Sequence, residues 1–182
     1  MSKLNSIAAA ATALAMTSGL AVAASHSEGA KELTASMIDA QGEEVGTATF
    51  SMTPSGIVLV SAEVSGLEPG EHGFHIHETG KCEPETEFKS AGGHYAGNGD
   101  PMHGTVEGGP HAGDMPNAFV GEDGMLRAEV FNPRVTLDGD MNPLMDEDGS
   151  ALMVHSGPDD YESQPSGDAG GRVACGVITA AE

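Results

Sequence analysis

The chain has 182 residues, and 28 acidic side chains against seven basic ones give it a formal net charge of -21. The length predicts one domain with a hydrophobic core and room for a processed end. A surface this acidic repels nucleic acid and anionic membranes, which both depend on lysine and arginine for affinity. The composition therefore excludes both as partners.

The N-terminus has the layout of a secretory signal peptide. Lys3 precedes an alanine-rich apolar stretch from Ile7 to Val22, which ends in small residues at the expected cleavage point. The alternative is a membrane anchor, but the stretch is shorter than the ~20 residues that a spanning helix needs. We predict a signal peptide over residues 1–23 and a soluble, exported domain over residues 24–182. Removing Lys3 leaves six basic residues against 28 acidic ones.

From residue 31 onward, apolar and polar residues alternate in short runs. The apolar positions of three such runs are Leu33, Ala35 and Met37; Ala48, Phe50 and Met52; and Val58, Val60, Ala62 and Val64. Period two is typical of strands, and turn residues at 41–42, 54–56 and 68–70 separate the runs at hairpin spacing. We expect an antiparallel sandwich or barrel. The regular pattern argues against disorder, the other interpretation of an acidic chain.

After His77 the alternation stops, and glycine, proline and histidine dominate residues 78–116. A loop this long inside a compact domain is usually functional or disordered, and its histidines favour function. Strand-like segments return at 125–131, 151–155 and 172–179, with a second irregular stretch over 157–171. No segment has a helical period long enough to predict a helix.

The chain has two cysteines, Cys82 and Cys175. Export favours a disulfide over two free thiols. In the chain-entropy model, closing a loop of about 93 residues is worth about 4 to 5 kcal/mol. Both cysteines also lie near candidate functional residues, so the bond is expected to hold a site in place as well as to stabilise the fold.

Seven residues suggest a metal site. They are His75, His77, His94, His103, His111, Asp114 and His155. Each histidine alone is more often a surface or packing residue, but six of them within 81 residues, beside an acid at close spacing, favour metal. Nitrogen ligands with a carboxylate suit zinc better than calcium or magnesium, which prefer oxygen.

His75 and His77 lie two residues apart at the end of a predicted strand, so their side chains point to one face and reach one ion. His72 points the other way and is expected to make hydrogen bonds in the core rather than to bind metal. Two four-coordinate sites need eight ligand positions, and only seven candidates exist. One histidine therefore has to serve both ions through its two ring nitrogens.

Five motifs in succession resemble the copper/zinc superoxide dismutase family in its exported bacterial form. They are Gly73-Phe74-His75-Ile76-His77-Glu78, Gly92-Gly93-His94-Tyr95, His111-Ala112-Gly113-Asp114, Val154-His155, and the run from Gly171 to Ile178. The resemblance covers essentially the whole mature chain. It implies an all-β, Greek-key antiparallel β-sandwich or barrel of immunoglobulin-like architecture with long metal-binding loops.

The resemblance also assigns roles to single residues. It implies copper ligands His75, His77, His94 and His155, and zinc ligands His94, His103, His111 and Asp114. It makes His94 the bridge and proton carrier, and Arg172 the arginine that guides the substrate. It pairs Cys82 with Cys175, and it identifies Asp159 as the carboxylate that links a copper histidine to a zinc histidine.

The implied activity is that of an antioxidant oxidoreductase of the periplasm or another exported location, which converts superoxide to dioxygen and hydrogen peroxide. The sequence does not decide the oligomeric state, and both a monomer and a homodimer are compatible with it. Residues 160–171 lack the basic residues usual in animal-type members, so the steering scheme and dimer surface of those members do not transfer. Lys81 and Lys89 are our hypothesis for local steering, and purely solubilising surface lysines are an equally weighted alternative.

Two other functions are alternatives to superoxide dismutation. The first is a copper-binding or copper-buffering protein that keeps the fold without turnover, and the second is a sandwich stabilised by zinc alone. The presence of all seven ligand positions and of Arg172 argues against the first, and the presence of His75, His77 and His155 argues against the second.

Overall fold

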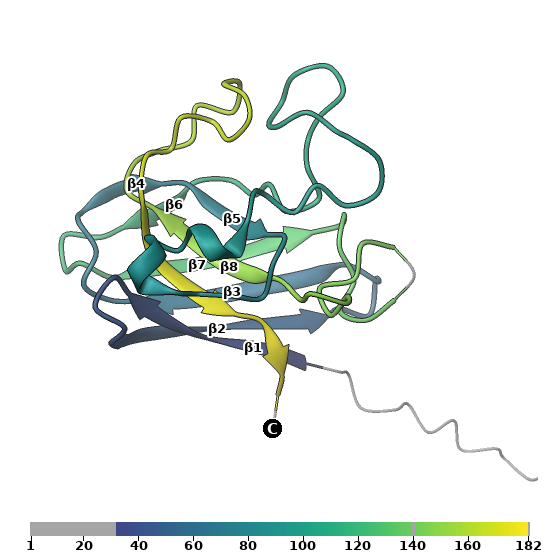
Figure 1. The fold of residues 1–182 in the computed structure, drawn as a ribbon. Helices are drawn as coiled ribbons and strands as arrows, with labels where there is room; N and C mark the ends of the chain where they lie inside the picture. Colours follow the sequence, from purple (N-terminus) through teal and green to yellow (C-terminus); the bar gives the residue numbers. More distant parts are fainter. Residues whose placement is uncertain (1–31, 140, 182) are drawn as a thin grey trace, which may run out of the picture.

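The computed structural model describes residues 32–139 and 141–181, so the predicted signal peptide lies outside the described residues. The described part is built almost entirely of strands (Figure 1). The strands are β1 (Glu32–Asp39), β2 (Glu44–Met52), β3 (Val58–Val64), β4 (Gly70–His72), β5 (Phe74–His77), β6 (Ala118–Val120), β7 (Leu126–Asn132), β8 (Ala151–His155), β9 (Arg172–Val177) and β10 (Thr179–Ala180). Two 3-10 turns, η1 (Pro84–Thr86) and η2 (Lys89–Ala91), follow β5.

The strands pair antiparallel in the order β4-β6-β7-β3-β2-β1-β9-β8-β5, with β10 against β1. The two end strands, β4 and β5, follow each other in the chain, so the sheet curls into a nearly closed barrel. Residues 65–69 and 133–150 connect strands that are not neighbours, as Greek-key connections do. The expected all-β antiparallel fold is confirmed.

The predicted period-two runs form β1, β2 and β3 and point into the barrel. Leu33, Ala35 and Met37 are buried on β1, and all four apolar positions of the third run are buried on β3. Burial of such apolar surface is the main favourable term in folding, at about 25 cal/mol per Å². Met52 departs from the prediction because it is only partly buried near the end of β2.

Strands β4 and β5 are separated at Gly73, whereas the sequence predicts that Gly73 belongs to the end of one strand. A Cβ atom at Gly73 would lie 2.8 Å from the Cβ of Ala169, which explains why a glycine fits there. Consequently His72 belongs to β4, which pairs with β6, whereas His75 and His77 belong to β5, which pairs with β8.

Two long connections lie over the same end of the barrel (Figure 1). They are residues 78–117, between β5 and β6, and residues 156–171, between β8 and β9. Direct hydrogen bonds join them: Thr105 N donates to Tyr161 O at 2.8 Å, and the side chain of Gln164 exchanges two bonds of 2.9 Å with the backbone of His103. The joined loops enclose the histidines.

The disulfide Cys82–Cys175 is present, as the sequence predicts. It ties the start of the first long connection to β9 and lies in a small apolar cluster with Phe88, Ala91 and Met153. Among the described residues, we find no helix whose length and apolar character would suit a membrane span.

Candidate metal centre

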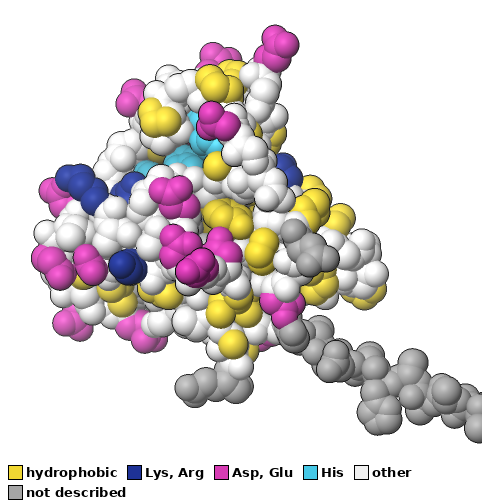
Figure 2. Space-filling model, turned by 45° about the vertical axis from the view of Figure 1, so that its right-hand side comes forward, with side chains coloured by type: hydrophobic (Ala, Val, Ile, Leu, Met, Phe, Trp, Pro, Cys, Tyr) yellow, Lys and Arg dark blue, Asp and Glu magenta, His cyan; other side chains and the backbone are white. Residues whose placement is uncertain are grey.

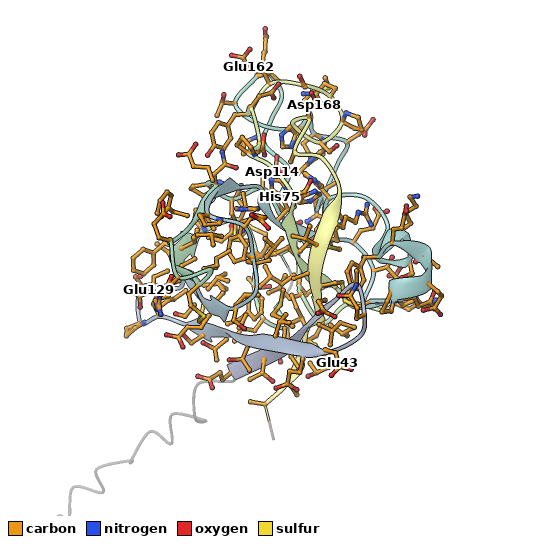
Figure 3. All side chains as sticks on the ribbon, turned by 90° about the vertical axis from the view of Figure 1, so that its left-hand side faces the viewer. Glu43, His75, Asp114, Glu129, Glu162 and Asp168 are labelled. Carbon is orange, nitrogen blue, oxygen red and sulfur yellow. A yellow bond between two sulfur atoms is a disulfide. The ribbon has the colours of Figure 1, made fainter. Side chains whose placement is uncertain are left out.

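The seven predicted ligand residues lie together as two groups of four that share His94. The first group is His75, His77, His94 and His155, and the second is His94, His103, His111 and Asp114. Within each group, one ligand atom per residue lies within 4.8 Å of all the others. Figure 2 shows histidine side chains in a recess below the two long loops, and Figure 3 places His75 beside Asp114.

Strand β5 positions both groups. His75 and His77 project from it toward the loops, and its free edge pairs with them: Ile76 N donates to Gly113 O, and Tyr95 N donates to Ile76 O. His155 comes from the neighbouring strand β8. These backbone bonds therefore place His94 and Asp114 directly against the strand that carries His75 and His77.

The ring nitrogens of the first group fit a metal ion. Nδ1 of His75 and Nε2 of His94 are buried without a hydrogen-bond partner. Nε2 of His77 and Nε2 of His155 face each other at 3.4 Å. Unpartnered buried polar atoms are costly, and a cluster of them is explained by a cation that they bind together.

In the second group, three imidazoles converge on one carboxylate oxygen. Nδ1 of His94, His103 and His111 lie 2.9, 3.1 and 3.4 Å from Oδ1 of Asp114. The other oxygen of Asp114 accepts bonds from the backbone N–H of Gly104 and of His111. The carboxylate is thus fixed on one side and offers Oδ1 to the three nitrogens, a donor set that suits zinc.

Asp159 links the two groups from behind. Its Oδ2 accepts a 2.7 Å bond from Nε2 of His75, and its Oδ1 accepts a 3.0 Å bond from Nε2 of His103. Such a carboxylate fixes the tautomer, so that the opposite nitrogen of each ring is free for metal. Burial alone would raise the pKa of Asp159, but the bonds from His75, Tyr161 N and His103 outweigh it and lower the pKa to about 2.

Burial favours the neutral form of His77, His94 and His155, which is the form that binds metal. Desolvation, with neighbouring histidines, lowers the pKa of His94 to about 4 and that of His155 to about 3. The pKa of His77 also falls well below its ordinary value, chiefly by burial and then through His94 and Arg172. Burial would raise the pKa of Asp114, but hydrogen bonds from His94 and Gly104 hold it far below the ordinary range.

A cavity of about 330 Å³ opens above the first group. Its lining includes His77, His94, His155 and Arg172, together with Pro165 and Ser166 of the second long loop. Both terminal nitrogens of Arg172 donate bonds of 2.6 Å, one to Phe88 O and one to Gly92 O. Gly92 O also accepts from Nδ1 of His77 at 3.1 Å, so one carbonyl positions the arginine and a histidine of the first group.

The other sequence candidates lie outside this centre. Both ring nitrogens of the buried His72 face carbonyl oxygens, of His155 at 2.6 Å and of Glu68 at 2.8 Å. Lys81 and Lys89 do not line the cavity, and Nζ of Lys89 lies 2.5 Å from Oε2 of Glu87.

Sequence analysis missed several residues that hold the loops. Gln164 binds the backbone of His103, and Asn117 exchanges two hydrogen bonds with the backbone of Asp159. Arg134 donates to the carbonyls of His111 and Asp114. These side chains act on backbone atoms, so no spacing between them could have identified them.

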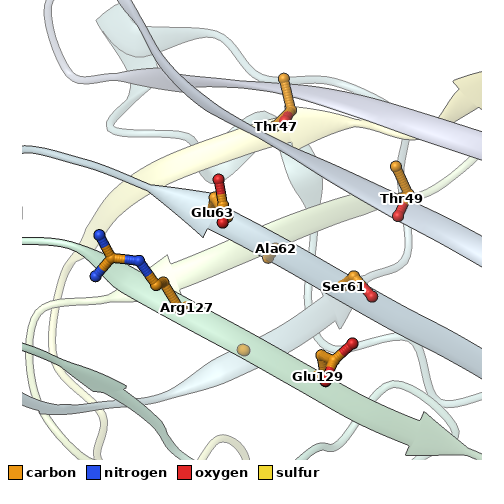
Figure 4. Close-up of a pocket in the computed structure, with 8 residues that line it drawn as sticks. Thr47, Thr49, Ser61, Ala62, Glu63, Arg127 and Glu129 are labelled. Atoms are coloured by element: carbon orange, nitrogen blue, oxygen red, sulfur yellow. The ribbon is translucent and has the colours of Figure 1, made fainter.

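A second hollow, of about 500 Å³, lies on the outer face of β2, β3 and β7 (Figure 4). It is lined by Thr47, Thr49, Ser61, Ala62, Glu63, Arg127, Ala128 and Glu129. None of its lining residues belongs to the two ligand groups, so it is separate from the metal centre.

Comparison with known proteins shows the family to which this fold belongs. The model of the family described as "Copper/zinc superoxide dismutase (SODC)" matches residues 44–178. "Superoxide dismutase [Cu-Zn] 2" of Aquifex aeolicus is 49% identical over 162 residues, which cover 87% of this chain and 92% of that protein.

Solved structures of superoxide dismutases and superoxide dismutase-like proteins have the same fold. The Cu/Zn superoxide dismutase of Brucella abortus aligns with a TM-score of 0.66 and 34% identity over 81% of this chain and 99% of that one. A SOD-like protein of Bacillus subtilis aligns with a TM-score of 0.74 and 33% identity over 80% and 97%. The chain belongs to the copper/zinc superoxide dismutase family. Its cofactors are copper and zinc.

Proposed function

We propose that the chain is an antioxidant superoxide dismutase whose copper ligands are His75, His77, His94 and His155 and whose zinc ligands are His94, His103, His111 and Asp114. The enzyme converts two superoxide anions and two protons to dioxygen and hydrogen peroxide. The single observation that carries the ligand assignment is that His94 belongs to both four-residue groups. This sharing supplies the eighth ligand position that seven residues alone lack.

The chemistry of the two metals differs. Copper, when bound, supplies a reversible one-electron change of oxidation state, whereas zinc has no redox chemistry and polarises and orders its ligands. A site with four nitrogen donors favours copper, and a site with three nitrogen donors and a carboxylate favours zinc. This difference in donor sets supports the assignment.

His94 is the proposed proton carrier. Its Nδ1 is directed to Oδ1 of Asp114 at 2.9 Å, while its Nε2 is buried without a partner toward the cavity side. When Nε2 does not bind copper, a proton held there would be delivered to the reduced substrate in the cavity, while Nδ1 keeps the ring in place. The two nitrogens thus have separate tasks, positioning and proton transfer.

Arg172 is the proposed binding group for the substrate. Superoxide is an anion, and the strongly acidic surface repels it on average, so attraction has to be local. Superoxide dismutases are themselves an established case of electrostatic steering. Arg172 lines the cavity beside His77 and His155 and carries a charge that is held in place by two carbonyls.

The steering role of the two lysines stays a hypothesis. Glu87 offsets the charge of Lys89 locally, which weakens its case relative to that of Lys81. Replacement of each lysine by methionine, with the rate measured over a range of ionic strengths, tests the role. An unchanged rate and salt dependence in both variants would remove the lysines from the account.

We also propose that residues 1–23 are a cleaved signal peptide and that the domain 24–182 works in the periplasm or another exported compartment. The disulfide Cys82–Cys175 supports this proposal, because such bonds persist in oxidising compartments. Mass spectrometry of the protein recovered from its native cells tests this proposal. Cleavage near Ala23 is expected, and a protein that still carries residues 1–23 would contradict it.

The activity itself is tested by metal analysis of the purified protein, with the dismutation rate measured before copper removal, after it, and after copper is restored. We expect about one copper and one zinc per chain and a rate that depends on copper. Binding of both metals without turnover would identify a copper-buffering protein. Zinc binding without copper binding would identify a zinc-stabilised sandwich.

A further inference from the structure

One arginine contacts both ends of the turn that carries two proposed zinc ligands. His111 and Asp114 begin and end this turn, and Asp114 N bonds to His111 O at 3.3 Å. Nε of Arg134 donates to His111 O at 3.2 Å, and Nη2 of Arg134 donates to Asp114 O at 2.5 Å. A single planar guanidinium therefore spans the turn from one ligand residue to the other.

The carbonyls between the two ends are also held. Asn132, whose side chain is buried, donates from Nδ2 to Ala112 O at 2.9 Å, and Ile76 N donates to Gly113 O at 2.9 Å. Oδ1 of Asn132 in turn accepts from the backbone N–H of Arg134 at 2.9 Å. All four carbonyls of the turn thus have donors, and Arg134 supplies those at both ends.

We infer that Arg134 is a positioning residue for zinc, one that holds the 111–114 turn so that Nδ1 of His111 and Oδ1 of Asp114 face one point. The inference rests on the proposed assignment of His111 and Asp114 as zinc ligands. Residues behind a metal ligand that fix its orientation typically contribute 10–100-fold to metal affinity. Arg134 acts here through backbone carbonyls rather than through a ligand side chain.

A positioning role and a purely electrostatic role of Arg134 predict opposite changes in zinc affinity when the residue is replaced. A guanidinium near a divalent cation repels it, so a purely electrostatic role would make zinc bind more tightly when the charge is removed. A positioning role makes zinc bind less tightly, because the turn loses the bonds of Arg134 to the carbonyls at both of its ends. The sign of the change in zinc affinity therefore decides between the two roles.

The effect is specific to one metal. The side-chain hydrogen bonds of Arg134 described above reach His111 and Asp114, which belong only to the second ligand group. Three of the four residues of the first group, His75, His77 and His155, lie on β5 and β8 and have no such bond to Arg134. Loss of Arg134 should consequently leave the copper affinity unchanged, whereas general damage to the fold would weaken both metals.

The test uses R134M and R134K, with R127M as the matched control. Arg127 lies on β7 and pairs with Asp123 at 3.0 Å, and it faces the outer hollow away from the metal centre (Figure 4). Zinc and copper dissociation constants are measured on the full domain, with its disulfide intact, by competition with chelators. Visible absorption of Co²⁺, bound in place of zinc, reports the geometry of that site.

We expect R134M to weaken zinc binding by about 10–100-fold, with an altered Co²⁺ spectrum and an unchanged copper constant. R134K should also lose affinity, because lysine donates from one point and cannot span both carbonyls. R127M should match the wild type. R134K keeps the inference testable if R134M does not fold.

Three results would overturn the inference while leaving the ligand assignment intact. They are unchanged zinc affinity in both variants, tighter zinc binding in R134M, and equal losses of zinc and copper. Failure of the wild-type protein to bind zinc would instead contradict the proposed function.

Discussion

Nε2 of His75 and Nε2 of His103 are joined through the two oxygens of one buried carboxylate, that of Asp159, at 2.7 and 3.0 Å. Each ring donates to Asp159, so each presents its Nδ1 to its own ligand group. A side chain outside the proposed ligand set thereby fixes one ring in each group. The two groups are consequently expected to respond together when this carboxylate changes.

The first prediction concerns Asp159 directly. Asp159→Asn removes the negative charge from both bonds and replaces one acceptor oxygen by an NH2 donor, so one of the rings of His75 and His103 loses its acceptor and the other keeps only a weaker, neutral one. We expect zinc and copper affinities to fall by about 10–100-fold each, as measured by chelator competition. Asp160→Asn is the control, because the side chain of Asp160 is exposed and its hydrogen bonds within the described residues go to Glu162 and Ser163. Equal affinities in the two variants would contradict the role of Asp159.

The second prediction separates substrate attraction from metal binding at Arg172. Arg172→Gln removes the cation that lines the cavity, while the ligand residues stay in place. We expect kcat/KM to fall by about tenfold or more with both metals still bound, because local steering accounts for about 10–10³-fold in association rates. Arg172→Lys should lie between the two, since it keeps the charge but not both carbonyl bonds. A fully metallated Arg172→Gln protein with the wild-type rate would exclude this role.

The third prediction is a loss of stability of the metal-free protein at acid pH. The folded-state pKa values of His94 and His155, about 4 and about 3, lie below the ordinary 6.5 because burial opposes the charged ring. The unfolded chain therefore binds protons that the folded protein does not. This contribution to stability is complete above pH 6.5 and is lost as the pH falls toward 3. The shift of His94 alone corresponds to about 3 kcal/mol.

Urea unfolding of the metal-free protein between pH 7 and pH 4 measures this effect. The free energy of unfolding should decrease steadily across the interval, and His155→Gln should make the decrease shallower. A constant free energy of unfolding over this interval would show that the histidines titrate alike in both states.

The fourth prediction concerns the disulfide, which closes a separation of 93 residues between Cys82 and Cys175. Replacing both cysteines by serine should lower the free energy of unfolding by up to about 4 to 5 kcal/mol in the chain-entropy model. It should also lower the dismutation rate, because the tethered segment carries Phe88 O and Gly92 O, which hold Arg172. Loss of stability with a full rate would show that the segment keeps its position without the bond.

The sequence predicts much of this fold because period-two alternation reports directly which face of a strand is buried. It fails where strands are too short to show a period. β6 has three residues, and β4 ends at His72, directly before Gly73, which has no room for a side chain beside Ala169. Tertiary contact, rather than local pattern, decides both cases.

In the candidate site, too, the sequence predicts some residues, the ligands, and misses others, the residues that support the loops. Ligand counting alone requires a shared histidine, and the family resemblance names His94, which lies in both groups. The supporting roles of Gln164, Asn117 and Arg134 depend on loops that meet only in the folded chain. Their partners are backbone atoms, which every residue has, so the amino-acid sequence carries no signal for them.

The central claim, that His94 joins a copper ion to a zinc ion, is tested most directly by a crystal structure of the metallated protein with anomalous scattering at both metal edges. The account predicts a copper peak at Nε2 of His94, among His75, His77 and His155, and a zinc peak at Nδ1, beside Asp114. A copper peak elsewhere, or a His94 that contacts only one metal in the oxidised protein, would contradict it.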